Sequence, residues 1–241
     1  MFAAIGVAYQ RLPVPPDLLA ETLPALAAAG FSGANVTIPH KQTALALADD
    51  KTPRAHAIGA ANTLSFAGGR IAADNTDAPG LLAALAEPVD GRSAMVLGAG
   101  GSARAVVWAL VDAGAREVRV WNRSGDRARH LASELGATAV EEAAVADRAD
   151  VLVNCTSVGL EAPSETFEQL PLGVADLGRF DVVVDLVYRP EGTALLHAAA
   201  KRGCAVVDGL EVLVQQGALS YEIWTGEKAD VERMRAAVRA A

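Results

Sequence analysis

A glycine cluster at the end of a short apolar run constrains the fold of this chain more than any other feature. Residues 93–97 predict a buried strand, and Gly98, Gly100 and Gly101 follow it, ahead of apolar residues at helical spacing. Such a strand-to-helix turn suits a pyrophosphate, because glycine admits the phosphates and the free N–H groups of the helix favour an anion. The third glycine of the usual fingerprint is not in its expected place. An ordinary strand-to-helix turn, without a bound phosphate, is therefore the alternative interpretation.

The residues after the next apolar run favour a phosphorylated cofactor. Residues 118–121 predict a second strand, and a dinucleotide-binding fold that uses NAD usually has an acidic residue at its end. This chain has Asn122, Arg123 and Ser124 there, followed by Arg127. Guanidinium groups bind phosphate oxygens through fork-shaped donors, whereas a carboxylate would repel them. The sequence therefore predicts NADP, and the alternative is that both arginines are solvated charges at the start of a helix.

Strands and helices alternate through the second half of the chain. Further strands are expected at residues 138–140, 151–154, 182–186 and 205–207, with helices at 124–135 and 193–202. This alternation predicts a parallel, doubly wound α/β sheet with ligands beyond the carboxyl ends of its strands. The polar residues after those strands are candidates to line one crevice: Asn122, Thr156, Ser157, Tyr188 and Gly209.

The first third of the chain follows a different pattern. It predicts a helix over residues 17–30 that Pro24 kinks or splits, a strand at 33–38, and short helices ending at Leu47 and Gly59. A hairpin over residues 61–73 and a helix over 78–86 come next, and Asp77 stands where it would cap that helix. A last long helix is expected at residues 210–224.

Composition narrows the classes of protein that are compatible with the chain. Its 241 residues are 51% hydrophobic, which is enough for a sizeable core, and its formal charge of −8 argues against nucleic acid or an anionic membrane as a partner. No apolar stretch reaches the roughly 18 residues that span a bilayer, and no signal pattern is found. Two cysteines predict neither a disulfide framework nor a metal site, and they fit a reducing cytoplasm.

Six short motifs occur in order along the chain and together carry a resemblance. They are residues 35–41 (NVTIPHK), 59–63 (GAANT), 74–77 (DNTD), 98–101 (GAGG), 122–124 (NRS), and Gly209-Leu210 followed by Gln216. In this combination the chain resembles the shikimate dehydrogenase family over essentially its whole length. The resemblance implies NADPH-dependent reduction of 3-dehydroshikimate to shikimate, in the pathway to aromatic amino acids.

The resemblance also implies two domains with a cleft between them. We expect a substrate domain of residues 1–78 completed by helices within 210–241, and an NADP-binding domain of residues 79–209. We also expect a small-molecule substrate and a cytoplasmic location. The protein is expected to be a monomer or a homodimer.

Reduction of a ketone by hydride needs a proton donor beside the developing alkoxide. Lys41 and Asp77 are the expected acid/base pair, with the lysine as the general acid/base, and no histidine is assigned a catalytic role. By the resemblance, Thr37, Asn62, Tyr188 and Gln216 would bind the substrate hydroxyls, although a packing role is nearly as plausible for Tyr188. The expected cofactor contacts are Gly98, Ala99, Gly100, Gly101, Ser102, Asn122, Arg123, Ser124, Arg127, Thr156, Leu186 and Gly209.

The chain departs from the family at its N-terminus. Family members begin with a strand and a Ser-x-Ser segment that binds the substrate carboxylate, followed by a helix whose later turns would be residues 1–7. That serine pair is missing here, and losing two charge-assisted hydrogen bonds would cost about 3–6 kcal/mol of binding free energy. We therefore expect the natural chain to start upstream. An NADP-binding protein that is inactive or regulatory, and a quinate-using enzyme, are the alternative interpretations.

Overall fold

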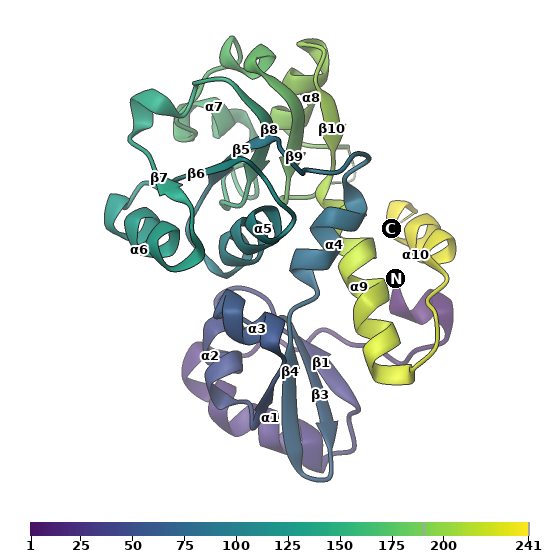
Figure 1. Cartoon of the computed structure of the whole chain (residues 1–241). Helices are drawn as coiled ribbons and strands as arrows, with labels where there is room; N and C mark the ends of the chain where they lie inside the picture. Colours follow the sequence, from purple (N-terminus) through teal and green to yellow (C-terminus); the bar gives the residue numbers. More distant parts are fainter. Residues whose placement is uncertain (190, 241) are drawn as a thin grey trace.

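Six parallel strands form the larger of two sheets in the computed structural model, which describes residues 1–189 and 191–240 (Figure 1). Their order is β10-β9-β8-β5-β6-β7, so the order along the chain reverses beside β5, where the glycine cluster begins. In sheets of this kind ligands bind at such a reversal. The strands are β5 (Ser93–Leu97), β6 (Glu117–Trp121), β7 (Thr138–Ala139), β8 (Ala149–Asn154), β9 (Phe180–Asp185) and β10 (Ala205–Val207).

Side chains of β5 alternate between two cores on opposite faces of this sheet. Ala94 and Val96 pack on one face under α5 (Gly101–Asp112) and α6 (Gly125–Leu135). Met95 and Leu97 pack on the other under α8 (Ala194–Lys201) and the segment that includes α7 (Thr166–Gln169). The central strand is therefore buried on both faces, as its uninterrupted apolar sequence predicts.

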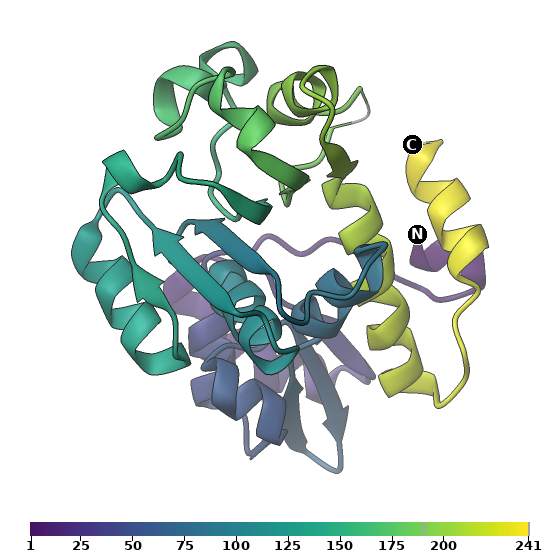
Figure 2. The same ribbon diagram turned by 45° about the horizontal axis from the view of Figure 1, so that its top comes forward.

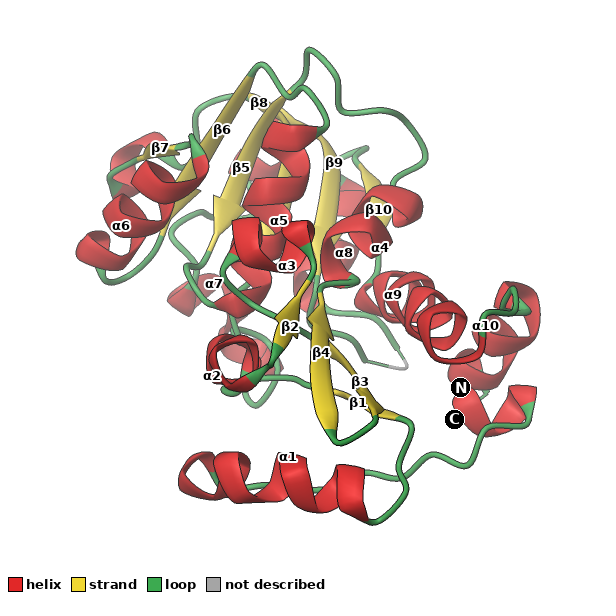
Figure 3. Ribbon diagram, turned by 60° about the horizontal axis from the view of Figure 1, so that its bottom comes forward, coloured by secondary structure: helices red, strands yellow, loops and turns green. Residues whose placement is uncertain are grey.

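Four strands form the smaller sheet, in the order β1-β3-β4-β2. Only the β2–β4 pairing is parallel. Three helices pack around this sheet (Figure 3), and Leu64 of β3 lies in the core that they cover. The hydroxyl of its neighbour Thr63 instead bonds to that of Ser220. The elements are α1 (Leu19–Ala28), β1 (Gly33–Asn35), α2 (Lys41–Leu47), β2 (Asp50–Lys51), α3 (Pro53–Ile58), β3 (Thr63–Ala67) and β4 (Arg70–Asp74).

Two helices, α4 (Asp77–Ala84) and α9 (Gly209–Thr225), run side by side between the sheets (Figure 1). Gly80 allows their close approach, because a Cβ there would lie 2.8 Å from the backbone nitrogen of Gln216. The outer side of α9 is covered by α10 (Val231–Arg239) and the 3₁₀ helix η1 (Phe2–Ile5), so the two ends of the chain lie close together (Figure 2). The other 3₁₀ helices are η2 (Pro16–Leu18), η3 (Glu142–Ala144), η4 (Pro163–Glu165) and η5 (Asp176–Arg179).

The predicted two-domain α/β fold with a parallel sheet is confirmed, and several elements differ locally. Pro24 does not split α1, which continues from a preceding 3₁₀ turn. The strand expected over residues 33–38 ends at Asn35, because the backbone turns toward α2 through Pro39. Residues 2–5 form a 3₁₀ turn rather than the end of an α-helix. Among the residues that the structure describes, no helix is both long and apolar enough to cross a membrane.

Candidate active site

Lys41 and Asp77, the predicted acid/base pair, form an ion pair where two helices begin. Lys41 is the first residue of α2 and Asp77 the first of α4, and Nζ lies 2.7 Å from Oδ2. The lysine side chain is only 9% exposed and the aspartate 17%, so water screens this pair weakly. A lysine held by one carboxylate oxygen can donate a proton as the ammonium and take one back as the neutral amine.

Asn75, rather than Asp77, caps α4. The Asn75 side-chain oxygen accepts hydrogen bonds from the backbone N–H groups of Asp77 and Ala78, and its amide donates to the Ala60 carbonyl. The sequence-based assignment of capping to Asp77 was therefore wrong. Because a neighbouring side chain takes the cap, both Asp77 carboxylate oxygens remain available to Lys41 and to Asn62.

Asn62 contacts the pair directly, and Gln216 contacts Asn62. The Asn62 amide nitrogen lies 2.8 Å from Oδ1 of Asp77 and 3.1 Å from Oε1 of Gln216, which comes from α9. Gln216 also donates to the Leu213 carbonyl. Side chains from α2, α4, α9 and the residue before β3 therefore meet at a single cluster of polar groups.

Three buried hydroxyls below this cluster were not foreseen. Thr63, Thr76 and Ser220 lie within 3.1 Å of one another and are at most 1% exposed. The backbone N–H and hydroxyl of Thr76 donate to Oδ1 of Asn62, which fixes the orientation of that amide. The sequence gives no signal for this contact, because the hydroxyls come from β3, the start of α4, and α9.

The glycine turn faces the same cluster from the larger domain. Gly98 has a φ of +111°, and a Cβ there would press on the backbone of Cys155, so both conformation and space require glycine. Nothing lies within 4 Å of a Cβ built on Gly100, and α5 starts there without a side-chain cap. Ser102, in the first turn of α5, accepts a 2.9 Å hydrogen bond from Lys41 Nζ. The turn thus offers uncapped N–H groups in open space, which fits a bound pyrophosphate.

The predicted 2′-phosphate residues follow β6 at the start of α6. The Asn122 amide donates to the Ser124 carbonyl at 3.0 Å, which closes the turn. Ser124 stands at the N-cap position, although its side chain makes no capping bond. Arg123 and Arg127 are exposed and form no ion pair within the described part of the chain, whereas nearby Arg129 is paired with Asp126. Two unpaired guanidinium groups at a helix start fit a phosphate.

The other strand ends converge on this turn. A Cβ on Gly209 would lie 2.7 Å from the Leu186 carbonyl, so α9 begins directly against the end of β9. The Thr156 hydroxyl, beyond β8, donates to Asn154 at 2.7 Å. Asp185 accepts hydrogen bonds from Asn154, Thr193 and the Val187 N–H, yet burial raises its pKa to about 6.

Thr37 and Tyr188 are not drawn into the cluster. Both are exposed, Tyr188 to 50%, and neither side chain makes a hydrogen bond within residues 1–189 and 191–240. Thr37 instead borders a cavity of about 690 Å³ between residues 8–15, α1 and β1. Lys41 and Asp77 do not line this cavity, but Asn35 does, and its amide donates to the Ser220 hydroxyl of the buried cluster at 2.9 Å.

Fold and site together define a class of protein. The strand order, the glycine turn at the reversal and the buried lysine–aspartate pair facing it are the features of a two-domain dinucleotide-binding oxidoreductase.

Family models and known proteins agree with this class. Residues 2–64 match the shikimate dehydrogenase substrate binding domain, residues 81–165 match shikimate / quinate 5-dehydrogenase, and residues 209–239 match the shikimate 5′-dehydrogenase C-terminal domain. The chain is 45% identical over 235 residues to a shikimate dehydrogenase (NADP(+)) of Paracoccus denitrificans, covering 93% of this chain and 82% of that protein. It is 48% identical over 214 residues to that of Thermus thermophilus, covering 88% and 79%.

A crystal structure of the Thermus thermophilus enzyme in complex with NADP(H) and shikimate superposes with a TM-score of 0.83. The two chains are 43% identical, and the match covers 94% of this chain and 85% of that one. The chain belongs to the shikimate dehydrogenase family, as its motifs predicted.

Proposed function

We propose that this chain catalyses the reversible, NADP-dependent reduction of 3-dehydroshikimate to shikimate. The observation that carries the proposal is the buried Lys41–Asp77 ion pair, which faces an uncapped glycine turn through the bond from Lys41 to Ser102. The names of the relatives support the substrate and the cofactor. We further propose a cytoplasmic location, in keeping with two free cysteines.

In this proposal Lys41 moves the proton. Its Nζ donates a proton to the substrate oxygen during reduction and takes it back during oxidation. Asp77 accepts a hydrogen bond from Lys41 and another from Asn62, so it holds the ammonium in one position. NADPH, when bound, supplies the hydride.

Residues of the larger domain would hold the cofactor. The first N–H groups of α5, from Gly101 onward, would bind the pyrophosphate, and Arg123 and Arg127 would bind the 2′-phosphate. Asn122, Ser124, Thr156, Leu186 and Gly209 would border the nucleotide. We assign this domain to residues 79–209.

Residues of the smaller domain and α9 would hold the substrate. Asn62 already contacts Asp77, and Gln216 contacts Asn62. Thr37 and Tyr188 have exposed hydroxyls for the ring substituents of the substrate. We assign this domain to residues 1–78 with 210–241.

Oxidation of shikimate by NADP⁺ tests the proposal. The assay has parallel arms with NAD⁺ and with quinate, and a Lys41→Ala variant shows any contaminating activity. We expect turnover with shikimate and NADP⁺ that the variant lacks. A folded chain that binds NADPH but oxidises neither shikimate nor quinate would support the inactive or regulatory alternative instead.

A further inference from the structure

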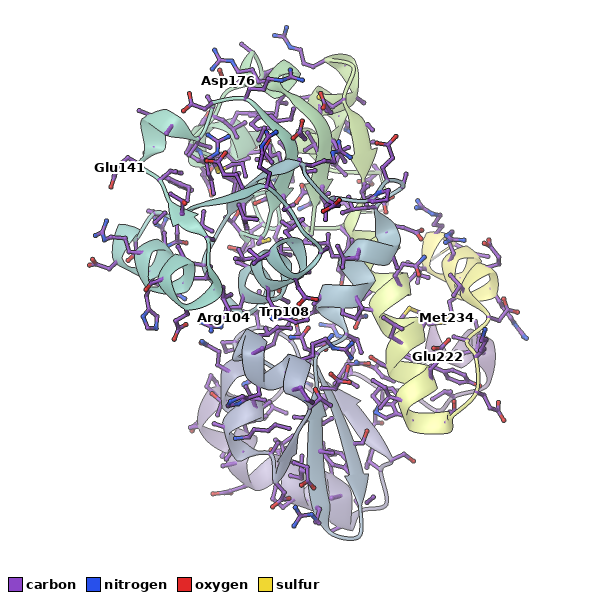
Figure 4. The ribbon with its side chains drawn as sticks, in the orientation of Figure 1. Arg104, Trp108, Glu141, Asp176, Glu222 and Met234 are labelled. Carbon is purple, nitrogen blue, oxygen red and sulfur yellow. The ribbon has the colours of Figure 1, made fainter. Side chains whose placement is uncertain are left out.

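Arg104 connects the two domains and has no role in the reaction proposed above. It lies on α5, two residues after Ser102, and its side chain points toward the smaller domain (Figure 4). Although charged, Arg104 is only 8% exposed. Burying a guanidinium costs free energy unless its N–H groups have hydrogen-bond partners. The partners of Arg104 therefore indicate its role.

The partners of Arg104 lie on both sides of the domain junction. Its Nε donates to the Ile58 carbonyl at 2.5 Å, at the end of α3 in the smaller domain. Its Nη1 forms an ion pair of 2.5 Å with Glu134 on α6 of the larger domain. Nη2 lies against Gly59, which has a φ of +72°, and a Cβ there would come within 2.6 Å of it.

The turn that Arg104 holds leads directly into the acid/base cluster. The N–H of Ala61 donates to the Lys41 carbonyl at 2.9 Å, and the N–H of Asn62 donates to the Asp74 carbonyl at 3.1 Å. The Asn62 side chain then contacts Asp77. Residues 58–62 therefore form a short, continuously hydrogen-bonded connection from α5 to the cluster.

We propose that Arg104 is a positioning residue, which fixes the turn of residues 58–62 against the cofactor-binding helix and so sets the place of Lys41 and Asn62 relative to the glycine turn. The inference rests on the proposed function. The first turns of α5 thus hold the acid/base cluster twice, through Ser102 on the Lys41 side chain and through Arg104 on the backbone beside it. Arg104 itself contacts none of the reacting groups.

The test compares Arg104→Met and Arg104→Lys with Arg119→Met. Arg119 is a matched control, because it is also 8% exposed but its partners lie inside the larger domain. It donates to the Asp147 and Arg148 carbonyls and pairs with the carboxylates of Glu117 and Asp147. For Arg104→Met we expect kcat to fall about 10- to 100-fold, since misplacement of reacting groups by about 1 Å has an effect of this size. Its dissociation constant for NADPH, measured by fluorescence, should stay within about two-fold of the wild-type value, because α5 keeps its glycine turn.

Arg104→Lys keeps a donor for the Ile58 carbonyl and should recover part of kcat. Arg119→Met should lower thermal stability while leaving kcat and NADPH binding near their wild-type values. If Arg104→Met and Arg104→Lys both fold and keep the wild-type kcat, the positioning role is disproved.

Amide hydrogen exchange supplies a readout that needs no turnover. The amides of Ala61 and Asn62 should exchange about ten-fold faster in Arg104→Met than in Arg119→Met, because only the former loses the bond to this turn. Equal exchange in the two variants would overturn the inference. Absence of turnover in the wild-type chain would instead refute the proposed function, and the exchange experiment would still decide the role of Arg104.

Discussion

At the scale of single residues, Asp185 shows how burial and hydrogen bonding oppose each other in this site. Three donors favour its carboxylate, yet burial outweighs them and raises its pKa to about 6. An unfolded aspartate has a pKa of about 3.9, so between these two values the folded chain keeps a proton that the unfolded chain has released. The stability from this carboxyl is therefore present below about pH 4 and is lost as the pH rises through 6.

Replacing Asp185 with Asn removes this titration. The free energy of unfolding of the wild type, relative to Asp185→Asn, should fall by about 2–3 kcal/mol between about pH 4 and pH 7. Urea unfolding of both proteins across this range measures the difference. A difference that does not change with pH would show that folding does not raise the pKa of Asp185.

Arg123 and Arg127 allow a test of cofactor choice at the same scale. Arg123→Ala should raise KM for NADP⁺ about ten-fold or more and leave kcat nearly unchanged, because a charged hydrogen bond contributes about 1.5–3 kcal/mol. KM for NAD⁺ should not rise. Arg129→Ala is the matched control, since Arg129 lies on α6, just beyond Arg123, but is already paired with Asp126. An equal rise in KM for both cofactors would show that Arg123 does not contact the 2′-phosphate.

The sequence motifs identified four residues of the candidate site: Lys41, Asp77, Asn62 and Gln216. The structure brings these four side chains together. It missed the hydroxyl cluster of Thr63, Thr76 and Ser220, because Ser and Thr are common and these three come from distant segments. Thr37 and Tyr188 remain predictions, since the side chains do not reach the cluster.

At the scale of elements, the contact between α4 and α9 determines whether Gln216 reaches Asn62, which in turn contacts Asp77. The two helices approach each other closely at Gly80, where a Cβ would meet the backbone of Gln216. Backbone atoms on both sides leave little room for adjustment, so the two helices must move apart to accept a larger residue.

Gly80→Ala should therefore lower the free energy of unfolding by about 1–3 kcal/mol and reduce kcat, because it shifts Gln216 away from Asn62. Gly178→Ala is the control, since nothing lies within 4 Å of a Cβ there and its φ is not positive. Denaturant unfolding and steady-state kinetics check both effects. Similar stability in the two variants would indicate that the helices adjust without strain.

Most strands and helices were predicted, including the short β7 and β10, whereas β2 and the packing of α10 were not. The strands of the larger sheet show continuous apolar runs, so their positions and parallel arrangement followed from the sequence. The two-residue β2 has no pattern of its own, and it exists because it pairs with β4. The final helix α10 is mostly polar and buries only Met234 completely, so its packing against α9 had little signal.

At the scale of the whole molecule, the proposed chemistry requires groups from both domains to meet. Lys41 comes from the smaller domain, Ser102 from the larger, and Gln216 from a helix that connects them. Contacts across this junction already hold the Lys41–Asp77 pair against the glycine turn. The central claim is that this pair moves the proton when hydride transfer reduces the substrate ketone.

The most direct test is a single turnover of NADPH with 3-dehydroshikimate at excess protein. The loss of NADPH fluorescence measures the rate. The wild type should oxidise one NADPH for each ketone, and Lys41→Met should react about 100- to 10,000-fold more slowly while still binding NADPH. Asp77→Asn should be slower than the wild type but faster than Lys41→Met. A Lys41→Met protein that oxidises NADPH at the wild-type rate would contradict the assignment of the proton to this pair.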